Sequence, residues 1–523
     1  MNSTQENLAR LQEMVSQEPA GAFIKELVGE FPESEVYLVG GMVRDAALGR
    51  VESKDLDVVI GGVPLNRLRS FLTSRGTVSL VGKTFGIFKF SPEGTDPRNQ
   101  IDVALPRKEH SLVPGGYRDF RIQSDADLPI EEDLGRRDFT VNAMAWDWKA
   151  SRLIDPFDGL EDIEKKRLRT VGSPHERFCE DYSRLLRAIR FSCQLGFDID
   201  PQTWDAVKDR MRSINEYRGN RPEERLVPFE VIAKELLKAF VSDPLRSFDL
   251  FDQSGGFEHL MPEVLEMKGC PQPEMYHAEG DVWSHTRMAL ESLTSDEFQK
   301  QFGAESVDAE LVMAVLFHDI GKPSTKKTPE KDGVDRIRFD KHDAVGAGLA
   351  RTVCTRLKLS SPPSEEPLHV DPDNVWWLVK NHLLGIRSDL EHMKNSTIEK
   401  YFLKDEGQGQ RLLKLIFSDG MATISPEGKP TVSNYFKLLD RVEQLRKIRD
   451  ERQIFQPILS GHEIMEAFHL KPGPRIGELL DVLREEQLAG RIESRQEALD
   501  FLKGTLRRAG SCTSRSDMKG NVA

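Results

Sequence analysis

The sequence predicts a multidomain protein with a mixed α/β head at its N-terminus and an all-α body after it. Short apolar runs separated by turns, such as EVYLVGG and DLDVVIGG, follow one another in the first part of the chain. From about residue 160 onward the apolar spacing is helical almost throughout. The chain has 523 residues, which is too long for one core, so we expect several domains.

The head is expected to contain alternating helices and strands. Residues 5–31 have the spacing of amphipathic helices, and the strand EVYLVGG then ends in two glycines. A helical stretch (VRDAALGR), the strand DLDVVIGG, a helix near 65–75 and strands near 78–81, 86–90 and 99–104 follow. Residues 107–134 are polar and turn-rich, and we expect a mobile loop there because long connections in compact domains are often functional.

Composition restricts the class of protein. No apolar run approaches the roughly 20 residues of a membrane helix, and the N-terminus lacks signal or transit character, so we expect a cytoplasmic protein without membrane contact. Reduced thiols are expected because the five cysteines show no CxxC spacing; they are Cys179, Cys193, Cys270, Cys354 and Cys512. The net charge of −13 disfavours a polyanionic partner unless local charge differs from the total.

The first candidate site follows the Gly-Gly turn. Asp55 and Asp57 form a D-x-D pair at the start of a predicted strand, where residues i and i+2 share a face and can hold divalent ions. Asp102, on another predicted strand, offers a third carboxylate. Gly40 and Gly41 let backbone N–H groups approach a triphosphate. A D-x-D pair alone is also typical of a solvated acidic turn, so the surrounding motifs matter.

Those motifs occur in a characteristic order. GGMVRD precedes the D-x-D pair and RRDFTVNAMA (136–145) follows it. This set resembles the class II family of tRNA nucleotidyltransferases and bacterial poly(A) polymerases. The resemblance implies a polymerase β-like nucleotidyltransferase head, Mg²⁺ on the D-x-D pair and a flexible hinge at DPFDG (155–159). It also implies a nucleotide-binding set in the head, comprising Gly40, Gly41, Arg44, Arg136, Arg137, Asp138 and Asn142.

The next motif, ERFCEDYSRLLRAIRF, is predicted to read the base. Glu180, Asp181 and Arg184 have spacings that place them on one face of a helix, which is also typical of a surface salt bridge. The resemblance assigns Asp181 and Arg184 to the Watson–Crick edge of the incoming nucleotide. An Asp acceptor and an Arg donor suit cytosine and adenine and reject uracil and guanine. Arg187 and Arg190 complete the expected nucleotide-binding set.

A second candidate site lies further along the chain. His285, the adjacent His318 and Asp319, and Asp419 match the H…HD…D pattern of HD phosphohydrolases, whose imidazole and carboxylate ligands hold metals that activate water. His342 and His382 are further ligand candidates. Any one of these histidines is more often a structural residue. The His318–Asp319 pair stands inside a predicted apolar helix, where a metal compensates the charge, so we expect Mg²⁺ or a divalent transition metal.

The C-terminal segment ILSGHEIMEAFHLKPGPRIGELLDVLREEQ resembles the tail that follows the HD region in this family. Lys471 and Arg475, around the Pro-Gly-Pro turn, are expected to contact tRNA phosphates. A helix pair that only closes the HD domain is the alternative interpretation.

These observations predict five segments: a head (1–165), a helical neck (166–245), an HD domain (246–450), a helical tRNA-binding segment (451–507) and a disordered tail (508–523). The predicted function is addition of CCA to tRNA from CTP and ATP, with hydrolysis of phosphoester ends by the HD domain. An A-adding enzyme or poly(A) polymerase is the close alternative, although the loop at 107–134 argues against a CC-only enzyme. An HD phosphohydrolase with a non-catalytic RNA-binding head is a different class. The oligomeric state, monomer or homodimer, stays open.

Overall fold

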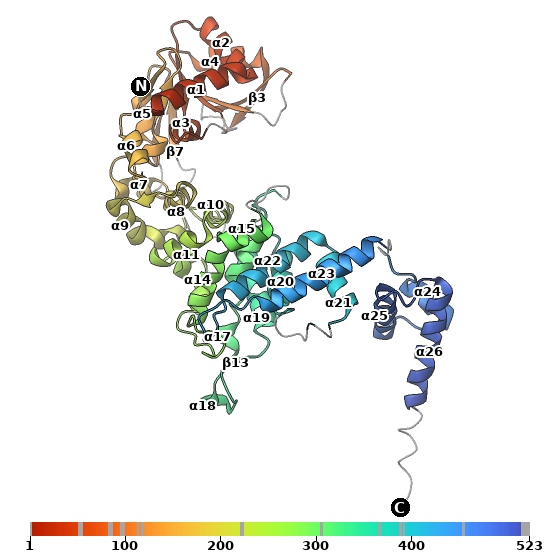
Figure 1. The fold of residues 1–523 in the computed structure, drawn as a ribbon. Coiled ribbons are helices and arrows are strands. Elements are labelled where there is room, and N and C mark those ends of the chain that lie inside the picture. Colours follow the sequence, from red (N-terminus) through yellow and green to blue (C-terminus); the bar gives the residue numbers. More distant parts are fainter. Residues whose placement is uncertain are drawn as a thin grey trace, which may run out of the picture. The chain divides into compact units, whose positions relative to one another are not determined.

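The structure is a computed structural model that describes residues 3–50, 56–81, 87–94, 100–111, 114–116, 120–219, 224–303, 307–363, 368–385, 390, 393–451 and 456–513. The chain forms two compact units (Figure 1). Unit 1 comprises residues 1–262 and 356–369, and unit 2 comprises residues 263–355 and 370–523. Among the helices described, we find none with the length and apolar character that crossing a membrane requires.

A seven-stranded mixed sheet forms the centre of the head in unit 1. Strands β2 and β5 run parallel, and the other neighbouring pairs are antiparallel. The mixed sheet confirms the predicted fold class. In sheet order the strands are β3 (Gly76–Val81), β4 (Ile87–Pro92), β5 (Ile101–Ala104), β2 (Leu56–Gly61), β1 (Glu35–Val39), β8 (Ala145–Asp147) and β9 (Arg152–Ile154).

Helices pack on this sheet through the alternating apolar residues of its central strands. Tyr37, Val39 and Val59 form one core cluster with Ile130 and Leu134 of α5. Elsewhere the rings of Phe23 and Phe90 lie 4.6 Å apart between α2 and β4. The helices of the head are α1 (Ser3–Gln17), α2 (Pro19–Glu30), α3 (Gly41–Ala47), α4 (Leu65–Thr73), α5 (Ile130–Gly135), the 3-10 turn η1 (Thr140–Asn142) and α6 (Gly159–Glu164).

The segment 107–134, expected to be a loop, contains regular structure instead. β6 (Arg107–Ser111) pairs antiparallel with β7 (Phe120–Ser124), and α5 follows. The sequence did not reveal the hairpin because β6 is polar along its length and lacks the apolar alternation of a half-buried strand. α5 was missed because only Ile130 and Leu134, one turn apart, mark its buried face. The expectation of an unstructured loop is therefore corrected to a hairpin followed by a helix.

The rest of unit 1 is mainly helical, as predicted. Its central element, α8, buries a face that includes Leu185, Leu186 and Ile189 and packs against α10. The elements are β10 (Arg167–Leu168), α7 (Pro174–Glu180), α8 (Ser183–Leu195), β11 (Asp198–Ile199), α9 (Pro201–Arg210), η2 (Met211–Asn215), α10 (Phe229–Ser242), α11 (Pro244–Gln253) and α12 (Gly256–Leu260).

Unit 2 is built almost entirely of helices (Figure 1). Its first group is α13 (Pro262–Leu265), α14 (Val282–Ser292), α15 (Asp296–Phe302), α16 (Ala309–Phe317), α17 (Lys322–Thr325), β12 (Lys326–Lys327), α18 (Pro329–Asp332), β13 (Arg338–Phe339), α19 (His342–Arg356) and α20 (Pro372–Asn381). The second group is α21 (Asn395–Ile398), the π-helix η4 (Glu399–Leu403), α22 (Glu406–Ala422) and α23 (Ser433–Glu451).

The last three helices of unit 2 have a core of their own. They are α24 (Gly461–Phe468), α25 (Pro474–Leu488) and α26 (Arg495–Thr513), and Ile464, Leu483 and Leu502 are members of their common apolar cluster. α26 remains helical through Thr513. This differs from the tail expected to be disordered from residue 508; residues 514–523 lie outside the described part.

Several helices of unit 2 begin at an acidic cap, which fixes where they start. The Oδ1 atoms of Asp281, Asp308 and Asp405 accept hydrogen bonds from backbone N–H groups in the first turns of α14, α16 and α22, at 2.9 to 3.0 Å. Each such cap stabilises its helix by about 1 kcal/mol. These three helices carry or end at metal-ligand candidates, so the caps help to position the second site.

Asp162 connects α6 to the strand that leads into the neck, and it generates the first prediction. Its side chain is fully buried and accepts hydrogen bonds from Thr140 Oγ1 at 2.6 Å, Arg167 Nε at 2.6 Å and Arg169 Nε at 2.9 Å. We expect Asp162→Ala to lower the free energy of unfolding by about 3 kcal/mol, because breaking a buried pair leaves its partners uncompensated.

The measurement is the urea midpoint of the transition that includes unit 1. The matched control is Asp205→Ala, whose carboxylate pairs with Lys208 on α9 and is 67% exposed. That surface pair is expected to contribute less than about 1 kcal/mol. Equal midpoint shifts in the two variants would contradict the structural role of Asp162.

Candidate functional site

Two carboxylates predicted as metal ligands lie side by side on the head sheet. β2 and β5 are parallel neighbours, and Asp57 and Asp102 are partners in their register. Partnered residues of adjacent strands face the same side of a sheet, so both side chains share one surface. Lys89, the partner of Asp102 on β4, reaches its Oδ1 atom at 3.7 Å. Asp55 lies outside the described residues, and β2 begins after it, at Leu56.

The Gly-Gly turn lies against Asp57, the first member of this pair. Gly40 has φ +77°, a conformation that favours glycine, and is the N-cap of α3. A Cβ atom added there would lie 2.8 Å from Asp57 Oδ2 and 3.4 Å from Arg137 Nη1. Any larger residue would therefore displace Asp57 or Arg137. Gly41 begins α3, and its position lies against the guanidinium of Arg44.

A chain of hydrogen bonds connects the turn to the neck. Arg44 Nη1 donates to Asn142 Oδ1 at 2.7 Å, and Asn142 Nδ2 donates to Asp138 Oδ1 at 3.1 Å. Arg187 on α8 donates to Asp138 Oδ2 through Nε at 2.8 Å and through Nη2 at 2.5 Å. Burial alone would raise the pKa of Asp138, but Arg187 and Asn142 hold it well below its usual value. Burial alone would lower the pKa of Arg187, but the negative charge of Asp138 raises it.

The remaining arginines of the predicted set are held by two acids that sequence reasoning missed. Asp133, fully buried on α5, accepts from Arg136 Nη2 at 2.8 Å and lies 3.6 Å from Arg137 Nη2. Glu235 on α10 accepts from Arg190 Nε. Asp133 stands three residues before the RRD motif, so its spacing was visible in the sequence; Glu235 shows no local signal. The cationic groups are thus fixed by the fold.

The predicted base-reading residues do not share one helix. α7 ends at Glu180, Asp181 has extended backbone, and α8 begins at Ser183. The expectation of a single helical face is therefore wrong, because Asp181 Oδ1 accepts from the backbone N–H of Ser183 and starts a new helix. Arg184 still reaches Glu180 at 2.5 Å across the break.

The guanidinium of Arg184 donates hydrogen bonds to three acceptors. Besides Glu180, it donates to the carbonyl oxygens of Arg177 and Arg136, at 3.0 and 3.2 Å. Burial raises the pKa of Asp181. A cleft of about 470 Å³ lies beside these groups, lined in part by Arg136, Arg177 and Glu180. Arg177, which also donates to Glu180, is a lining residue that the sequence analysis did not single out.

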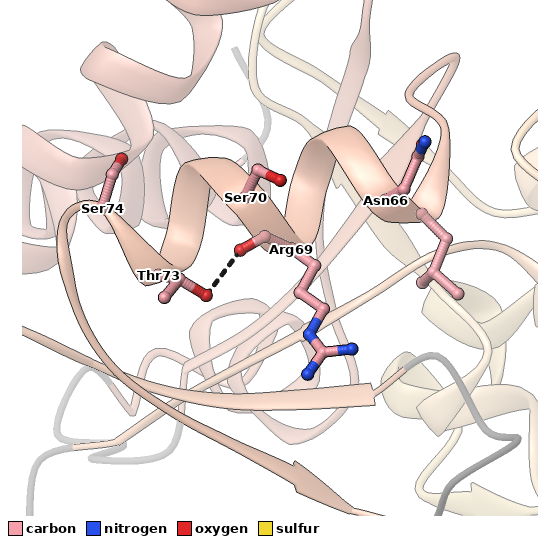
Figure 2. A pocket seen from close by; sticks show the side chains of 6 residues that line it. Asn66, Arg69, Ser70, Thr73 and Ser74 are labelled. Atoms are coloured by element: carbon pink, nitrogen blue, oxygen red, sulfur yellow. Dashed lines mark hydrogen bonds between the residues drawn. The ribbon is translucent and has the colours of Figure 1, made fainter.

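A larger groove runs along α4, but it has no such chemistry. Figure 2 shows its lining residues, which extend from Leu65 to Ser74 on this one helix and enclose about 940 Å³. The hydroxyl of Thr73 donates to the carbonyl of Arg69 at 2.8 Å. Since the lining contains no carboxylate and no imidazole, it offers neither metal ligands nor acid–base groups. We assign it no role.

The six HD candidates meet in unit 2 and are all buried. His285 lies on α14 and Asp419 on α22, while His318 and His382 stand at the C-terminal caps of α16 and α20, and His342 begins α19. His318–Asp319 therefore closes an apolar helix, where the prediction had it inside one. The predicted ligands form two groups, His285–His318–Asp419 and Asp319–His342–His382, with the ligand atoms of each group within 4.8 Å of one another.

Asp319 belongs to the second group and also contacts His318 of the first. Its Oδ2 is 3.3 Å from His318 Nε2, and its Oδ1 is 3.4 Å from His342 Nε2. Lys322 Nζ lies 2.6 Å from Oδ2. Burial alone would raise the pKa of Asp319, but Lys322 and His318 hold it well below its usual value, so the carboxylate is ionised. An ionised carboxylate shared by two imidazole groups suits one or two divalent ions.

Backbone carbonyls fix the protonation of three imidazoles. The Nδ1 atoms of His318, His342 and His382 lie 2.7, 2.8 and 2.6 Å from the carbonyl oxygens of Val315, Phe339 and Val379. A carbonyl only accepts, so each Nδ1 carries the proton, and a neutral ring then presents an Nε2 lone pair to the cluster.

His382 shows most clearly that the cluster fits a metal. Burial and the neighbouring His318 and His342 lower its pKa to about 3, so the ring is neutral. Its buried Nε2 makes no hydrogen bond with any residue that the structure describes. A buried nitrogen lone pair without a donor is unfavourable, and a metal ion would satisfy it.

Glu279, which sequence reasoning did not select, supports the fourth imidazole. Its fully buried carboxylate accepts from His285 Nδ1 at 2.9 Å, from His277 Nδ1 at 2.6 Å and from the backbone N–H of Ile424 at 2.8 Å. Burial alone would lower the pKa of His285, but Asp419 and Glu279 raise it to about 9. The His-x-Glu spacing six residues before His285 was the available signal.

The predicted RNA contacts of the C-terminal segment are both exposed. Lys471 precedes α25, and Arg475 lies in its first turn. Their side chains are accessible to a ligand, but the structure shows no second feature there that identifies one.

Glu279 generates the second prediction. Glu279→Gln is expected to lower the affinity of the cluster for Mn²⁺ by about tenfold to a hundredfold, because loss of a carboxylate behind a ligating histidine has effects of that size. Equilibrium dialysis measures the affinity. The control is Glu291→Gln, an exposed residue on α14. If the two variants bind Mn²⁺ equally well, Glu279 does not act through His285.

Two family models match this chain. Residues 36–169 match the poly A polymerase head domain, and residues 282–416 match the HD domain. Domains of both kinds are generally metal-dependent. The first match contains Asp57, Asp102 and Asp138, and the second contains His285, His318 and Asp319.

Curated relatives extend the similarity. The multifunctional CCA protein of Nitrosococcus oceani is 36% identical over 329 residues, which are 62% of this chain and 70% of that protein. The A-adding tRNA nucleotidyltransferase of Deinococcus radiodurans is 31% identical over 470 residues, which are 89% of this chain and 94% of that protein.

Solved structures share the fold. The CCA-adding enzyme of Thermotoga maritima complexed with tRNA has a TM-score of 0.56 at 19% identity and covers 95% of this chain and 98% of its own. The CCA-adding enzyme of Bacillus stearothermophilus in complex with CTP has a TM-score of 0.56 at 20% identity, covering 98% and 100%. With the head motifs and the HD cluster in place, this chain is an enzyme that belongs to the family of tRNA nucleotidyltransferases with an HD domain.

Proposed function

We propose that this enzyme adds CCA to the 3′ end of tRNA from CTP and ATP without a nucleic-acid template. The observation that carries the proposal is the register pairing of Asp57 with Asp102 beside Gly40, inside a poly A polymerase head. Two multifunctional CCA proteins are 36% and 35% identical to this chain over the regions that match. The cytoplasmic location expected from the sequence stays part of this proposal.

In this proposal Asp55, Asp57 and Asp102 hold Mg²⁺. Bound there, Mg²⁺ would activate the 3′-hydroxyl of the RNA and neutralise charge on the triphosphate. Gly40 and Gly41 give the triphosphate access to backbone N–H groups, and Arg136 and Arg137 add positive charge. Asp133, which binds both arginines, keeps their guanidinium groups oriented.

Asp181 and Arg184 are proposed to read the base. Cytosine and adenine each present an amino donor next to a ring acceptor, which a carboxylate and a guanidinium can complement. Arg184 is held by Glu180 and two carbonyl oxygens, so its direction is set before a nucleotide arrives. Because Asp138 binds Arg187 on the same helix, α8 keeps a fixed position relative to the head.

The HD cluster is proposed to hold Mg²⁺ or a divalent transition metal and to hydrolyse phosphoester ends, either 2′,3′-cyclic phosphates or phosphomonoesters. The ligands are His285, His318, Asp319 and Asp419, with His342 and His382. Metal bound there would activate water. Lys471 and Arg475 are proposed to contact the tRNA backbone.

The experiment that tests the function supplies two substrates, tRNA lacking its 3′ CCA and tRNA ending in CC, each with CTP, ATP, UTP and GTP singly and together. CCA addition predicts that CTP alone extends the tRNA, that ATP completes it and that UTP and GTP are rejected. Extension of a CC-ending tRNA by ATP alone, with no use of CTP, would indicate an A-adding enzyme. A long run of A would indicate a poly(A) polymerase. Either result would overturn the proposal.

Asp57 generates the third prediction. Asp57→Ala is expected to reduce nucleotide addition by roughly a thousandfold, because a metal site supplies several kcal/mol of transition-state stabilisation. The fold should persist, since Asp57 is partly exposed. Primer extension and circular dichroism measure the two effects, with the exposed Glu93→Ala as the control. The same result is expected for Asp55→Ala. Normal extension by Asp57→Ala would rule out the metal assignment.

Arg184 generates the fourth prediction. Arg184→Ala is expected to relax discrimination against UTP by roughly tenfold to a hundredfold, the usual contribution of a bidentate base contact. Triphosphate binding should change less, because the phosphates are held near Asp57 and Gly40. The measurement is kcat/KM for CTP, ATP and UTP. A uniform fall for every nucleotide would show instead that Arg184 only braces Glu180, and an unchanged CTP-to-UTP ratio would exclude it from base reading.

A further inference from the structure

A short basic segment lies between two ligand candidates of the HD cluster. Residues 322–341, which we call the basic hairpin, carry seven Lys or Arg against four Asp or Glu, whereas the whole chain has 73 against 86. β12 and β13 form its stem, with Lys326 opposite Phe339 and Lys327 opposite Arg338. α18 lies at its outer end (Figure 1). A local positive charge on an acidic protein marks a candidate surface for a polyanion.

Both ends of the basic hairpin are attached to the cluster. At the first end Lys322 Nζ lies 2.6 Å from Asp319 Oδ2. At the other end His342 Nδ1 donates to the carbonyl of Phe339 at 2.8 Å. The stem strands are separated from Asp319 and His342 by only a few residues of sequence. A phosphate bound along the stem would therefore be held next to the segments that carry these two ligand candidates.

Several cationic side chains of the basic hairpin are accessible to solvent. Lys326, Lys331 and Lys341 are exposed and form no ion pair with any carboxylate in the described part of the chain. Arg336 and Arg338 are exposed as well, although Asp335 pairs with both. Binding a phosphate to the lysines would not require breaking an existing pair.

An exposed aromatic ring lies near Arg336 of the basic hairpin. Tyr276 is 48% exposed, and the guanidinium of Arg336 lies 6.0 Å from the centre of its ring. Its loop is tied to the cluster on both sides of the ring, because Lys322 Nζ donates to Gln272 at 2.6 Å and His277 donates to Glu279, which holds His285. An exposed ring in a fixed loop is a platform on which an unpaired base can stack.

We propose that the basic hairpin and Tyr276 dock the single-stranded 3′ end of an RNA and deliver its terminal phosphoester to the HD cluster. Phosphates lie on Lys326 and Lys331, and a base upstream of the 3′-terminal nucleotide stacks on Tyr276. Stacking requires an unpaired base, which favours a single strand over a duplex. This inference rests on the proposed hydrolysis of phosphoester ends, and it adds which substrates the cluster receives.

The test compares two substrates that end in the same group: 2′,3′-cyclic CMP and a single-stranded RNA heptamer with a 2′,3′-cyclic phosphate. Lys326→Ala combined with Lys331→Ala, and Tyr276→Ala alone, are each expected to lower kcat/KM for the heptamer by roughly tenfold. kcat/KM for the mononucleotide should stay within about twofold, since it makes neither contact. The control pair, Lys437→Ala with Lys447→Ala, removes the same charge from exposed positions on α23.

Salt dependence gives an independent readout. For the heptamer, the slope of log KM against log salt concentration should become shallower in the lysine variant by about 0.7 for each lost phosphate contact. Equal losses on both substrates, or no loss on the heptamer, would overturn the docking proposal.

A crosslinking experiment separates this inference from the function on which it rests. RNA carrying 5-iodouridine immediately before its 3′-terminal nucleotide is irradiated with the full-length protein, and the crosslinked peptide is identified by mass spectrometry. A crosslink to Tyr276 supports docking even if neither substrate is hydrolysed, in which case only the hydrolase function fails. Hydrolysis of both substrates without a crosslink in the segment 270–281 would overturn docking and leave the hydrolase intact.

Discussion

The ion pair between Asp138 and Arg187 is the interaction on which the nucleotidyltransferase half depends. Asp138 is buried, so its charge is tolerated only because Arg187 and Asn142 donate to it. Asn142 in turn holds Arg44 beside the Gly-Gly turn, and Arg187 belongs to α8, the helix of Arg184. One buried carboxylate therefore fixes α8, the helix proposed to read the base, relative to the strands of Asp57 and Asp102. Without the Asp138–Arg187 pair, the strands that carry Asp57 and Asp102 would still form, but α8 would have no fixed position relative to them.

Buried carboxylate charge must also be compensated in unit 2, but there the compensating groups are different. The carboxylates of Asp319 and Asp419 are buried as well, but the groups around them are mostly imidazoles whose Nδ1 atoms are already committed to carbonyls or to Glu279. The protein thereby leaves nitrogen lone pairs and negative oxygen atoms facing one another. A divalent cation satisfies both kinds of group at once, so an arrangement that would be costly as a packed core is suited to a metal centre.

The sequence predicted the elements that apolar periodicity marks. It missed the features that depend on individual side-chain contacts or on a polar strand. The mixed sheet and the helical body were predictable because apolar periodicity shows within short stretches, whereas the HD candidates, spread from His285 to Asp419, were predicted from their resemblance to the HD pattern. The helix break at Asp181 was not, because a side-chain cap within a run of helix formers decides it. The hairpin of β6 and β7 was missed since its first strand, β6, is polar. Glu235 shows no local signal and was found only with the fold, whereas the His-x-Glu spacing before His285 was available for Glu279 and was not used.

We expect the two sites, one in each unit, to work independently. The most direct measurement is made on Asp319→Asn, which keeps the size of the side chain and removes its charge. Bound metal and CCA addition are determined on the same preparation. We expect metal bound at the HD cluster to fall by an order of magnitude or more, while addition stays within about twofold. A fall in addition as large as the fall in bound metal would contradict this expectation.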